Sequence, residues 1–441
     1  MKLAGWGRFP VHETRVTAPR SEAALIERIA EGGLIARGNG RAYGDSAVGR
    51  PNTVHMRHLN RMITFNDAIG QLVAEAGVLL ADIISSFLPR GWFPAVTPGT
   101  KFVTLGGMIA ADVHGKNHHR DGSIRRFVDW IDVVDASGAV QRCSREHNSE
   151  LFEWTIGGMG LTGVILRAAV RLRPVETGWI KQETIPVPNL DAAMDAFENA
   201  YDATYSVAWI DSMSTGDKRG RSLVMLGEHA RRDELNATQR ARPYETPSSR
   251  LKISVPFDAP SFLLNRATVR AFNQLYHWNG ARKTGTSLVD WDSYFYPLDA
   301  VLDWNRLYGR KGFAQFQCVL PIEQSRKGIK AVLQATSQKG SGSCFTVLKR
   351  LGEQEGRFSF PMLGYTLALD FPVNGRTLEL MEALDRIVLE HRGRIYLAKD
   401  SRMTAKTLAQ NDERAKKFVQ MRDAGGLRSR FQSAQSERLA L

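Results

Sequence analysis

One short stretch, residues 98–119, gathers the glycines, imidazoles, ammonium group and amide that could hold and transform a ligand. It contains Gly99, Gly106, Gly107 and Gly115 and ends in the run H-G-K-N-H-H. Glycine permits positive φ and lets the backbone lie flush against a flat ligand, and successive free N–H groups in tight turns form anion sites. The stretch therefore predicts a site for a large, flat, phosphorylated ligand, with an ordinary loop between strands as the alternative.

The same stretch lacks the two common nucleotide fingerprints, since it has neither the lysine-serine ending of a P-loop nor a G-x-G-x-x-G between a strand and a helix. A second glycine-rich run, residues 37–45 (R-G-N-G-R-A-Y-G-D), follows the apolar residues 34–36. Three glycines interleaved with two arginines after a strand predict a phosphate cradle, because N–H groups bind the anion and arginine neutralises its charge. The alternative is a surface turn with solvated arginines.

The composition bounds the class of protein. The chain has 441 residues, enough for two or three domains, and its 43% apolar and 24% charged residues are those of a globular protein. Its nearly apolar runs fall well short of the roughly 18–20 residues that span a bilayer. The chain begins without the apolar core of a signal peptide. Its opening G-W-G-R around Trp6 is expected to fold back onto a ligand.

The charge balance favours anionic partners. Lys and Arg number 59 against 46 Asp and Glu, a net charge of +13. Because no nucleic-acid-binding motif accompanies it, a phosphate-bearing substrate or a membrane surface is favoured over nucleic acid. Cys143, Cys318 and Cys344 are odd in number, widely spaced and without C-x-x-C. They predict reduced thiols in a cytoplasmic setting, with no disulfide framework and no metal site.

The order of the expected helices and strands changes near residue 177. Before it, apolar patterns predict helices over residues 21–30, 79–88 and 149–156 and strands over 34–36, 54–56, 62–65, 71–75, 127–135, 139–142 and 164–173. After it they predict strands over 205–210, 222–226, 313–320, 344–349 and 364–371 and helices over 322–337 and 378–391. Strands broken by helices in this order predict an antiparallel sheet with helices on one face and the other face free to meet a ligand. Residues 393–402 are expected to form a strand that enters a polar turn.

Two glutamines in the expected strand 313–320 mark that free face. Gln315 and Gln317 point the same way because strand side chains alternate. Their amides are either paired internally or offered to a polar substrate. Upstream, the segment 251–283 combines apolar residues with arginine. It is either a covered core segment or a part that dips into an anionic membrane surface.

Four motifs together resemble the flavoproteins of the vanillyl-alcohol-oxidase type, which carry a PCMH-type FAD-binding domain. They are R-x-Y-G-D at 41–45, H-G-K-N-H-H at 114–119, G-F-x-Q-x-Q at 312–317 and Y-x-A-K-D-S-R at 396–402. The similarity is greatest to the decaprenylphosphoryl-β-D-ribose 2-oxidase branch and runs from Gly5 to the C-terminus.

This resemblance implies an α+β fold of two domains. Residues 1–177 would form the FAD-binding domain, residues 178–393 would form the substrate domain with the antiparallel sheet over the flavin, and residues 394–441 would return to the FAD-binding domain.

The resemblance also implies FAD as the cofactor. In the family, the FAD phosphates lie against the turn at 38–41 and the loop at 104–107, and the isoalloxazine lies near 98–99 and 111–114. The first glycine loop has no histidine, so non-covalent FAD is expected. The positions that match FAD contacts are Arg37, Gly38, Asn39, Gly40, Arg41, Ala42, Tyr43, Gly44, Gly99, Thr104, Leu105, Gly106, Gly107, Ala111, Asp112, Val113, His114, Asn117, Ile165 and Tyr396.

The implied reaction is oxidation of the ribose 2-hydroxyl of a polyprenylphosphoryl-β-D-ribose to a 2-keto sugar. A separate NAD(P)-dependent short-chain reductase would then complete an epimerisation towards an arabinose donor for cell-envelope or glycoconjugate synthesis. The alcohol must lose a proton from oxygen, so a lysine or tyrosine of lowered pKa is the natural base. Lys399, Tyr43 and His114 match catalytic positions, although a salt bridge to Asp400 or Asp45 is the alternative role for Lys399. The positions that match substrate contacts are Lys116, Tyr296, Gln315, Gln317, Lys349, Thr366 and Lys399.

Two alternatives stay open. Within the same fold, the chain would be an aldonolactone or alditol oxidoreductase acting on a soluble sugar; outside it, a basic membrane- or nucleic-acid-binding protein without catalysis. We expect a cytoplasmic protein in peripheral contact with the inner face of the membrane. Thr366 and Ala368 depart from the Asn and Cys of mycobacterial members, which bears on lipid length and sugar. Val113 stands where a smaller residue would leave more room near the flavin, which predicts slow reaction with oxygen.

Overall fold

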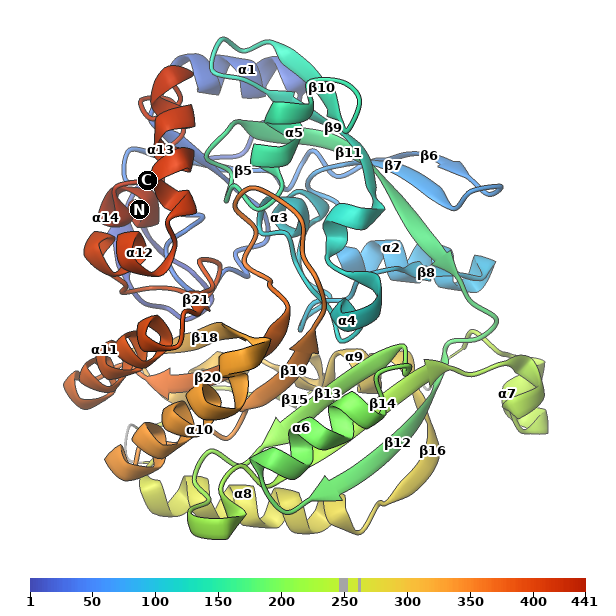
Figure 1. The fold of residues 1–441 in the computed structure, drawn as a ribbon. Helices are drawn as coiled ribbons and strands as arrows, with labels where there is room; N and C mark the ends of the chain where they lie inside the picture. The colour runs from blue at the N-terminus through green and yellow to red at the C-terminus, as the bar shows by residue number, and fades with distance from the viewer. Residues whose placement is uncertain (246–252, 261–262) are drawn as a thin grey trace.

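The chain forms two stacked regions (Figure 1). The computed structural model describes residues 1–245, 253–260 and 263–441. We call the elements before residue 178 together with the C-terminal helices the N-terminal region, and the eight-stranded sheet with its helices the sheet region. Of the segment 251–283, residues 251, 252, 261 and 262 lie outside the described residues.

Three sheets build the N-terminal region. β1 (Lys2–Ala4) pairs antiparallel with β2 (Val11–Glu13), and a parallel sheet has the order β3 (Arg15–Thr17), β5 (Asn52–His55), β4 (Leu34–Arg37). An antiparallel sheet has the order β10 (Val140–Ser144), β9 (Val128–Val134), β11 (Val164–Pro174), β7 (Gln71–Glu75), β6 (Met62–Asn66), with β8 (Trp92–Pro94) paired to β11. The helices here are α1 (Glu22–Ala30), α2 (Leu80–Phe87), α3 (Leu105–Ala110), α4 (His118–Asp121) and α5 (Ser149–Thr155).

The sheet region is built on eight antiparallel strands. Their order is β16 (Gly285–Asp290), β12 (Trp179–Val187), β14 (Ser222–His229), β13 (Tyr205–Ile210), β19 (Val347–Leu351), β20 (Gly364–Pro372), β18 (Phe313–Pro321), β21 (Arg394–Ile395). Further elements of this region are α7 (Ala237–Ala241), α9 (Trp291–Phe295), the parallel pair β15 (Ile253–Ser254) and β17 (Val301–Leu302), and the 3-10 helices η3 (Gly216–Lys218), η4 (Arg232–Glu234), η5 (Pro297–Ala300) and η6 (Trp304–Tyr308). The N-terminal region also contains the 3-10 helices η1 (Leu88–Arg90) and η2 (Ile124–Phe127).

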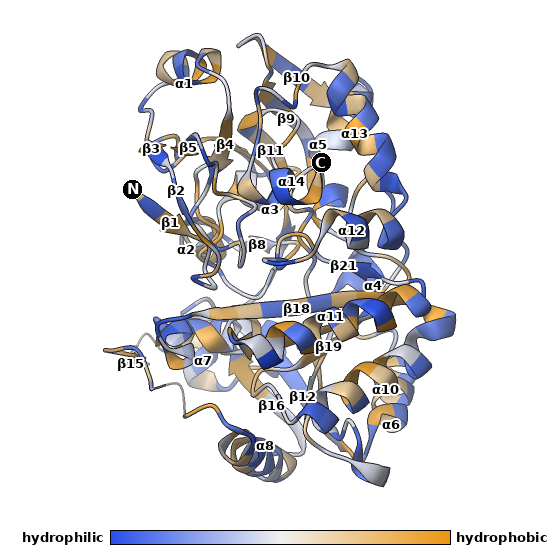
Figure 2. Cartoon of the chain, turned by 90° about the vertical axis from the view of Figure 1, so that its left-hand side faces the viewer, coloured by the Kyte–Doolittle hydropathy of each residue, from blue (hydrophilic) through white to orange (hydrophobic). Residues whose placement is uncertain are grey.

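Three amphipathic helices cover one face of the eight-stranded sheet. They are α6 (Leu190–Asn199), α10 (Ile322–Lys339) and α11 (Gly375–Glu390), which lie along the same side of the sheet in Figures 1 and 2. Their apolar stripes, with polar residues on the outer side, pack on the inward residues of β13, β18, β19 and β20 in one continuous core. Asparagine caps start α6 and α11, since Asn189 accepts a hydrogen bond from the Ala192 N–H and Asn374 from the Thr377 N–H.

Strand alternation turns the polar residues of these strands to the opposite face. In β18, Ala314, Phe316 and Cys318 belong to the helix-side core, whereas Gln315 and Gln317 line a cavity on the other side. β20 follows the same pattern, with its leucines in the core and a polar set facing the cavity. Because the side-chain period is two, one apolar face thus creates one functional face. The expected antiparallel sheet with a free face is confirmed.

The C-terminal segment returns to the N-terminal region. β21 pairs with β18 for two residues, and the chain continues into α12 (Ala405–Asn411), α13 (Arg414–Ala424) and α14 (Ala434–Leu439). Phe431 then forms a parallel bridge with Leu34, next to the three-stranded sheet. This path follows the expected return, while the exact domain boundaries at 177 and 393 stay a prediction.

Several expectations about local structure need correction. Gly106 and Gly107 do not form a turn of positive φ; they lie in α3, because the Thr104 hydroxyl caps that helix by accepting from the Gly107 N–H at 3.3 Å. Residues 393–402 form only the short β21 before a turn. Several elements, among them β8, β12, β16, α3 and α6, were not expected. The other expected strands and helices are confirmed, with ends shifted by a few residues.

Two further observations concern membranes and metals. In the part of the chain that the structure describes, no helix is long and apolar enough to cross a membrane. Within the same residues, no cluster of three or more His, Cys, Asp or Glu side chains is arranged to hold a metal ion. The three cysteines are unpaired.

Candidate cofactor and substrate site

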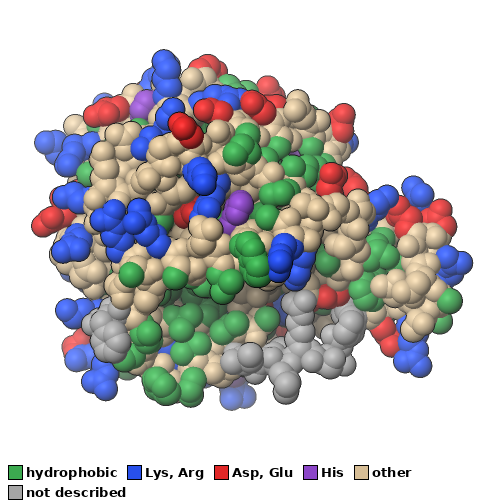
Figure 3. All heavy atoms as spheres, turned by 90° about the horizontal axis from the view of Figure 1, so that it is seen from below, with side chains coloured by type: hydrophobic (Ala, Val, Ile, Leu, Met, Phe, Trp, Pro, Cys, Tyr) green, Lys and Arg blue, Asp and Glu red, His purple; other side chains and the backbone are tan. Residues whose placement is uncertain are grey.

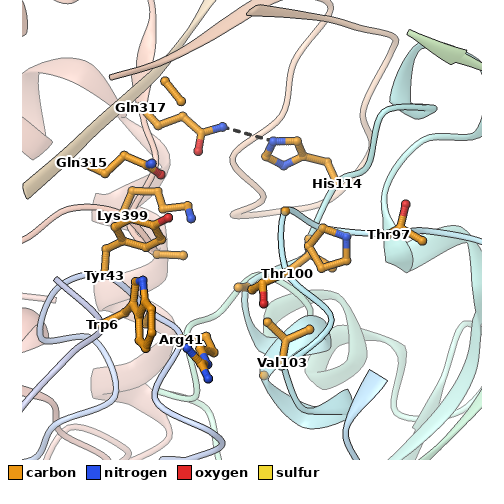
Figure 4. Close-up of a pocket in the computed structure, with 18 of the residues that line it drawn as sticks. Trp6, Arg41, Tyr43, Thr97, Thr100, Val103, His114, Gln315, Gln317 and Lys399 are labelled. Carbon is orange, nitrogen blue, oxygen red and sulfur yellow. Dashed lines mark hydrogen bonds between the residues drawn. The ribbon is translucent and has the colours of Figure 1, made fainter. Parts of the chain in front are cut away.

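A cavity of about 610 Å³ lies between the N-terminal region and the free face of the sheet. Figure 4 shows the two sides of the cavity facing each other, with Lys399 against Tyr43, Arg41 beside Trp6 and His114 reaching across to Gln317. The N-terminal region supplies glycine-rich backbone together with Arg41, Tyr43 and His114, and the sheet supplies Gln315, Gln317 and Lys349. The cavity thus unites the two glycine-rich runs with the polar face of the sheet.

We call the cavity surface formed by the glycine-rich runs 37–45 and 98–119 the glycine wall. At several of its glycines the packing is so close that a side chain would not fit. A Cβ added to Gly38 would lie 2.1 Å from the Thr104 hydroxyl, and one added to Gly106 would lie 2.7 Å from the Ala76 Cβ. Gly40 has φ +65°, in the left-handed region that favours glycine. The two glycine-rich runs therefore touch each other and form a single surface on which a ligand can lie against backbone.

The N-terminal G-W-G-R folds onto this wall, and its expected contact with a ligand stays a prediction. The Arg41 guanidinium lies 4.0 Å from the ring centroid of Trp6, and both residues line the cavity. A Cβ on Gly5 would lie 2.0 Å from the Gly44 carbonyl oxygen, and one on Gly7 would lie 2.4 Å from the Phe313 carbonyl oxygen. These glycines let Trp6 close one end of the cavity.

A hydrogen-bonded chain connects the two walls. The Gln317 amide donates to His114 Nε2 and to the Thr366 hydroxyl, both at 3.2 Å. Burial, with Lys349 as a smaller cause, holds the pKa of His114 well below its ordinary value, so the imidazole is neutral. Its Nδ1 is buried and has no partner among the described residues. Tyr396 stacks on Phe360 at 4.4 Å beside this histidine and donates its hydroxyl to the Ala111 carbonyl at 2.8 Å.

Three lysines line the cavity, all of them buried. Burial, and then Lys349, lowers the pKa of Lys116 to about 7. Burial lowers the pKa of Lys349 to about 8 and that of Lys399 to about 7. Among the described residues, no carboxylate lies within salt-bridge distance of these amines; Lys116 donates to the Tyr294 carbonyl, and the Lys399 Nζ lies 3.7 Å from the Tyr43 ring centroid. The cavity therefore holds amines that can change protonation near neutral pH.

One carboxylate stands close enough to influence Lys399. Asp370 accepts a hydrogen bond from the Gln315 amide at 2.6 Å, and both line the cavity. Burial raises the pKa of Asp370 to about 7, and the charge of Lys399 acts in the opposite direction. Burial also raises the pKa of Tyr43 well above its ordinary value, so this phenol stays protonated. The amine of Lys399, rather than Tyr43, is therefore the group able to take up a proton.

The alternative role for Lys399 does not hold. Asp400 and Asp45 both accept from Arg438, at 3.0 Å and 2.7 Å, and these acids hold the C-terminal helix α14 against the first glycine-rich run. Neither forms a salt bridge with Lys399 in the described residues.

Most of the residues predicted for the site come together around the cavity. Those that line it are Gly38, Asn39, Gly40, Arg41, Ala42, Tyr43, Gly99, Thr104, Gly106, Gly107, Ala111, Val113, His114, Lys116, Ile165, Gln315, Gln317, Lys349, Thr366, Tyr396 and Lys399. The roles of these residues stay proposals.

Six predicted residues stand behind the lining, and each has a structural partner there. The Arg37 guanidinium donates to the Ala4 carbonyl at 2.9 Å, and Gly44 packs against the Asp400 carbonyl. Leu105 is in the core, and Asp112 accepts from Ser359 at 2.5 Å and Gln354 at 3.0 Å. Asn117 donates to the Ala95 carbonyl at 2.8 Å, and the buried Tyr296 ring lies 6.0 Å from Trp291. They shape the loops that present the lining.

The sequence interpretation missed several lining residues of the sheet region. Asp370, Trp209, Asp299, Tyr276 and Phe345 line the cavity and were not predicted. A signal for Asp370 was present, because Thr366 and Asp370 are four residues apart in one strand and must share a face. The aromatic residues come from separate elements, and no local pattern brings them together.

The comparison with known proteins places the chain among FAD-dependent oxidases. Residues 14–144 match the family described as FAD binding domain. The whole chain is 34% identical to decaprenylphosphoryl-beta-D-ribose oxidase of Mycolicibacterium smegmatis, over 97% of that protein. An uncharacterized protein of Streptomyces coelicolor is 31% identical over 82% of this chain and 99% of its own length. L-gulonolactone oxidase of Bos taurus is 28% identical over 36% of this chain and 37% of its own length.

The residues of the cavity fit FAD. Gly38 and Gly106 pack so closely against Thr104 and Ala76 that no side chain fits at either position, and both line the cavity. Buried polar atoms of three lining residues, Arg41 Nε, Thr97 Oγ1 and His114 Nδ1, have no protein partner in the described residues. Arginine and backbone N–H groups suit a pyrophosphate. FAD is thus the cofactor, the protein is an FAD-dependent oxidoreductase, and the chain belongs to the decaprenylphosphoryl-β-D-ribose oxidase family of flavoproteins.

Proposed function

We propose that this enzyme oxidises the 2-hydroxyl of a polyprenylphosphoryl-β-D-ribose to the 2-keto sugar. The observation that carries the proposal is the set of three buried lysines, Lys116, Lys349 and Lys399, in a cavity that also fits FAD. Buried amines without a carboxylate partner favour an anionic ligand, and the phosphate of the substrate supplies that charge. The whole-length similarity to the mycobacterial oxidase supports the sugar and the lipid.

In the proposed reaction, Lys399 takes the proton of the ribose hydroxyl. Burial lowers the pKa of its amine to about 7, so the neutral form that can accept a proton predominates above that pH. Bound FAD would supply the hydride acceptor, so that the alcohol, which gives its hydroxyl proton to Lys399 and a hydride from the carbon that bears this hydroxyl, becomes a ketone. Tyr43 keeps its proton and holds the Lys399 amine over its ring at 3.7 Å. The two residues thus fix where the proton goes.

The remaining polar residues position the sugar and its phosphate. Gln317 joins His114 to Thr366, and we assign this chain to binding of the ribose hydroxyls. We assign Lys116 and Lys349 to the phosphate, because an anion between them would relieve the repulsion that lowers the pKa of Lys116. Phosphate binding should therefore be accompanied by proton uptake near pH 8.

The proposed product defines a partner. A 2-keto sugar on a lipid phosphate is only half of an epimerisation, so a separate NAD(P)-dependent short-chain reductase must reduce it with inverted configuration to the arabinose donor. Since the substrate is a membrane lipid, we place the enzyme in peripheral contact with the inner face of a membrane. Non-covalent binding of FAD belongs to the same proposal, since the glycine wall has no histidine at 41–43.

Anaerobic stopped-flow spectroscopy tests the proposal. The holoenzyme is mixed with polyprenylphosphoryl-β-D-ribose, and in parallel with free ribose, ribose 5-phosphate and an aldonolactone. We expect the oxidised-flavin absorbance to bleach rapidly with the lipid-linked sugar alone. Equally fast bleaching by an aldonolactone or a free sugar would replace the proposal by the soluble-sugar alternative.

A further inference from the structure

A group of exposed apolar side chains surrounds one end of the cavity. α8 (Arg266–Ala281) packs on β12 and β14 and lies apart from α6, α10 and α11 in Figure 2. We define the mouth patch as Phe257, Leu263, Phe272, Leu275, Tyr276 and Trp278, whose exposed fractions run from 37% to 70%. Such a concentration of large exposed apolar residues on one face marks an interaction site rather than ordinary surface. Figure 3 shows hydrophobic side chains gathered beside a hollow on the face seen from below.

The mouth patch is continuous with the inside of the cavity. Tyr276 is 42% exposed and also lines the cavity, where its ring lies 4.7 Å from that of Trp209. Phe272 lies 6.0 Å from Phe345, and Phe345 lies 5.9 Å from Trp304. Trp209, Phe345 and Trp304 are all lining residues. A path of aromatic side chains therefore leads from the lining of the cavity to the protein surface.

Cations flank the mouth patch at both ends. The Arg282 guanidinium lies 3.9 Å from the Trp278 ring centroid, and Lys283 follows it. At the Phe257 end, a small surface hollow is lined by Arg8, Arg306 and Arg310 together with one acid, Asp258, which pairs with Arg8 at 2.5 Å. Residues 259–289 contain no Asp or Glu. Aromatic and apolar side chains between cations match the interfacial zone of an anionic bilayer.

We propose that the mouth patch docks the enzyme on an anionic lipid surface and that the prenyl chain of the substrate enters the cavity there. The inference rests on the proposed function, because a lipid-linked substrate gives the aromatic path its purpose: its long apolar chain can move from bilayer to cavity without exposure to water. A second copy of the chain is a poorer occupant, since a two-fold contact through this face would bring its flanking cations close to one another.

Vesicle co-sedimentation of the holoenzyme tests the apolar part of the proposal. The probes are vesicles of phosphatidylcholine alone and of phosphatidylcholine with phosphatidylglycerol at 3:1. We expect binding to the anionic vesicles and at least a tenfold loss in the Leu275→Glu and Trp278→Glu variants, because the bilayer interface would have to accept a carboxylate. Ile69→Glu is the matched control: Ile69 is 53% exposed, at the β6–β7 turn of the N-terminal region. An equal loss in this control, or no binding of the wild type, would overturn the proposal.

A charge series tests the cations. The double variant Arg282→Gln with Lys283→Gln should lower partition to the anionic vesicles by about fivefold for each cation removed. At high salt, which screens the charges, the double variant and the wild type should partition equally. The control is Lys416→Gln with Lys417→Gln on the exposed side of α13. Equal losses in the two double variants would show that only the overall charge matters, which contradicts docking through this patch.

Two further measurements separate this inference from its alternatives. Light scattering after gel filtration reports self-association, and a dimer that Leu275→Glu abolishes would assign the patch to a second copy and overturn the proposal. Geranylphosphoryl-β-D-ribose, a short-chain substrate, reports turnover without vesicles. If this short-chain substrate bleaches the flavin but the enzyme does not bind vesicles, the docking proposal alone is wrong. If the enzyme binds vesicles but neither the short-chain nor the long-chain substrate bleaches the flavin, the proposed function is wrong. Docking could then not serve the delivery of this substrate, and the inference would fall with the function.

Discussion

The two walls of the cavity are made of different material. The wall from the N-terminal region is largely backbone, with Gly38 and Gly106 in contact distances that exclude a Cβ. The wall from the sheet carries Lys349, Gln315 and Asp370 on strands whose other face is apolar core. A rigid backbone surface suits the binding of a large flat cofactor, whereas buried ionisable side chains suit proton transfer. Loss of the glycine surface should therefore weaken cofactor binding, and loss of the buried ionisable side chains should weaken turnover.

Removal of Lys399, the proposed base, is the strongest test of this separation between proton transfer and cofactor binding. Lys399→Ala deletes the proposed base, and we expect turnover to fall by about 10²–10⁴-fold, the usual contribution of a general base. The glycine wall is untouched, so the purified variant should remain yellow with unchanged FAD content. Stopped-flow bleaching and the flavin spectrum measure both properties, and Lys416→Ala on α13 serves as the surface control. Retained turnover would remove Lys399 from the mechanism.

The opposite failure is expected from the glycine wall. Gly99 lines the cavity, and a Cβ there would meet no protein atom within 4 Å. Gly99→Ala should therefore leave the stability of the apoprotein unchanged and weaken FAD binding by roughly 10-fold, the effect of about 1.4 kcal/mol of overpacking against the ligand. Fluorescence titration of the apoprotein with FAD measures this affinity.

The control for this change lies far from the cavity. Gly375 begins α11, and a Cβ there would also meet nothing within 4 Å. Gly375→Ala should bind FAD normally. An unchanged FAD affinity in Gly99→Ala would show that the cofactor does not lie against this part of the wall.

The same division explains what sequence reasoning could predict. The glycine wall is formed by two contiguous runs, residues 37–45 and 98–119, so its residues could be predicted directly from the sequence. Part of the sheet wall was also predictable, since strand alternation places Gln315 and Gln317 on one face. Trp209 and Phe345 could not be foreseen, because they come from strands and loops distant in sequence whose pairing depends on the whole sheet. The expected glycine turn at Gly106 and Gly107 was also wrong, because Thr104 caps a helix that contains both glycines.

A charge change inside the sheet wall should sharpen the comparison through pH. In the wild type, kcat/KM should rise through about pH 7 as Lys399 loses its proton. The Asp370 carboxylate raises the pKa of Lys399, and the cation of Lys349 lowers it. Asp370→Asn removes the anion, so the pKa of Lys399 should fall further and the rising limb should move to lower pH. The plateau should drop by about 3–10-fold, because the amine becomes a weaker base.

The pH profile distinguishes this electrostatic effect of Asp370 on the pKa of Lys399 from a merely structural role of Asp370. Asp299 also lines the cavity, but its carboxylate accepts from the Lys101 N–H at 2.9 Å and does not act on Lys399. Asp299→Asn should leave the midpoint of the rising limb unchanged. A limb that stays in place in Asp370→Asn, or moves equally in both variants, would contradict the role given to Asp370.

The smallest expected effect concerns Val113, an apolar residue of the N-terminal wall next to His114. Val113 lines the cavity, and its backbone is held on both sides, since its N–H donates to the Met108 carbonyl and its carbonyl accepts from Ile124, both at 3.0 Å. Val113→Ala should thus enlarge the cavity without moving the wall. We expect reduced enzyme to react with oxygen about fivefold faster, a barrier lowered by roughly 1 kcal/mol, while the anaerobic rate of flavin reduction stays the same.

The result depends on where space is created rather than on how much. Val103→Ala removes the same two carbons from another lining residue of the same wall. If access of oxygen to the flavin is limited beside His114, oxygen-electrode rates should rise in Val113→Ala and remain at the wild-type value in Val103→Ala. Equal rates in all three proteins would mean that the slow oxygen reaction has another cause, such as the electrostatics of the buried lysines that line the cavity. The wall from the N-terminal region would then bind the cofactor without limiting the access of oxygen to it.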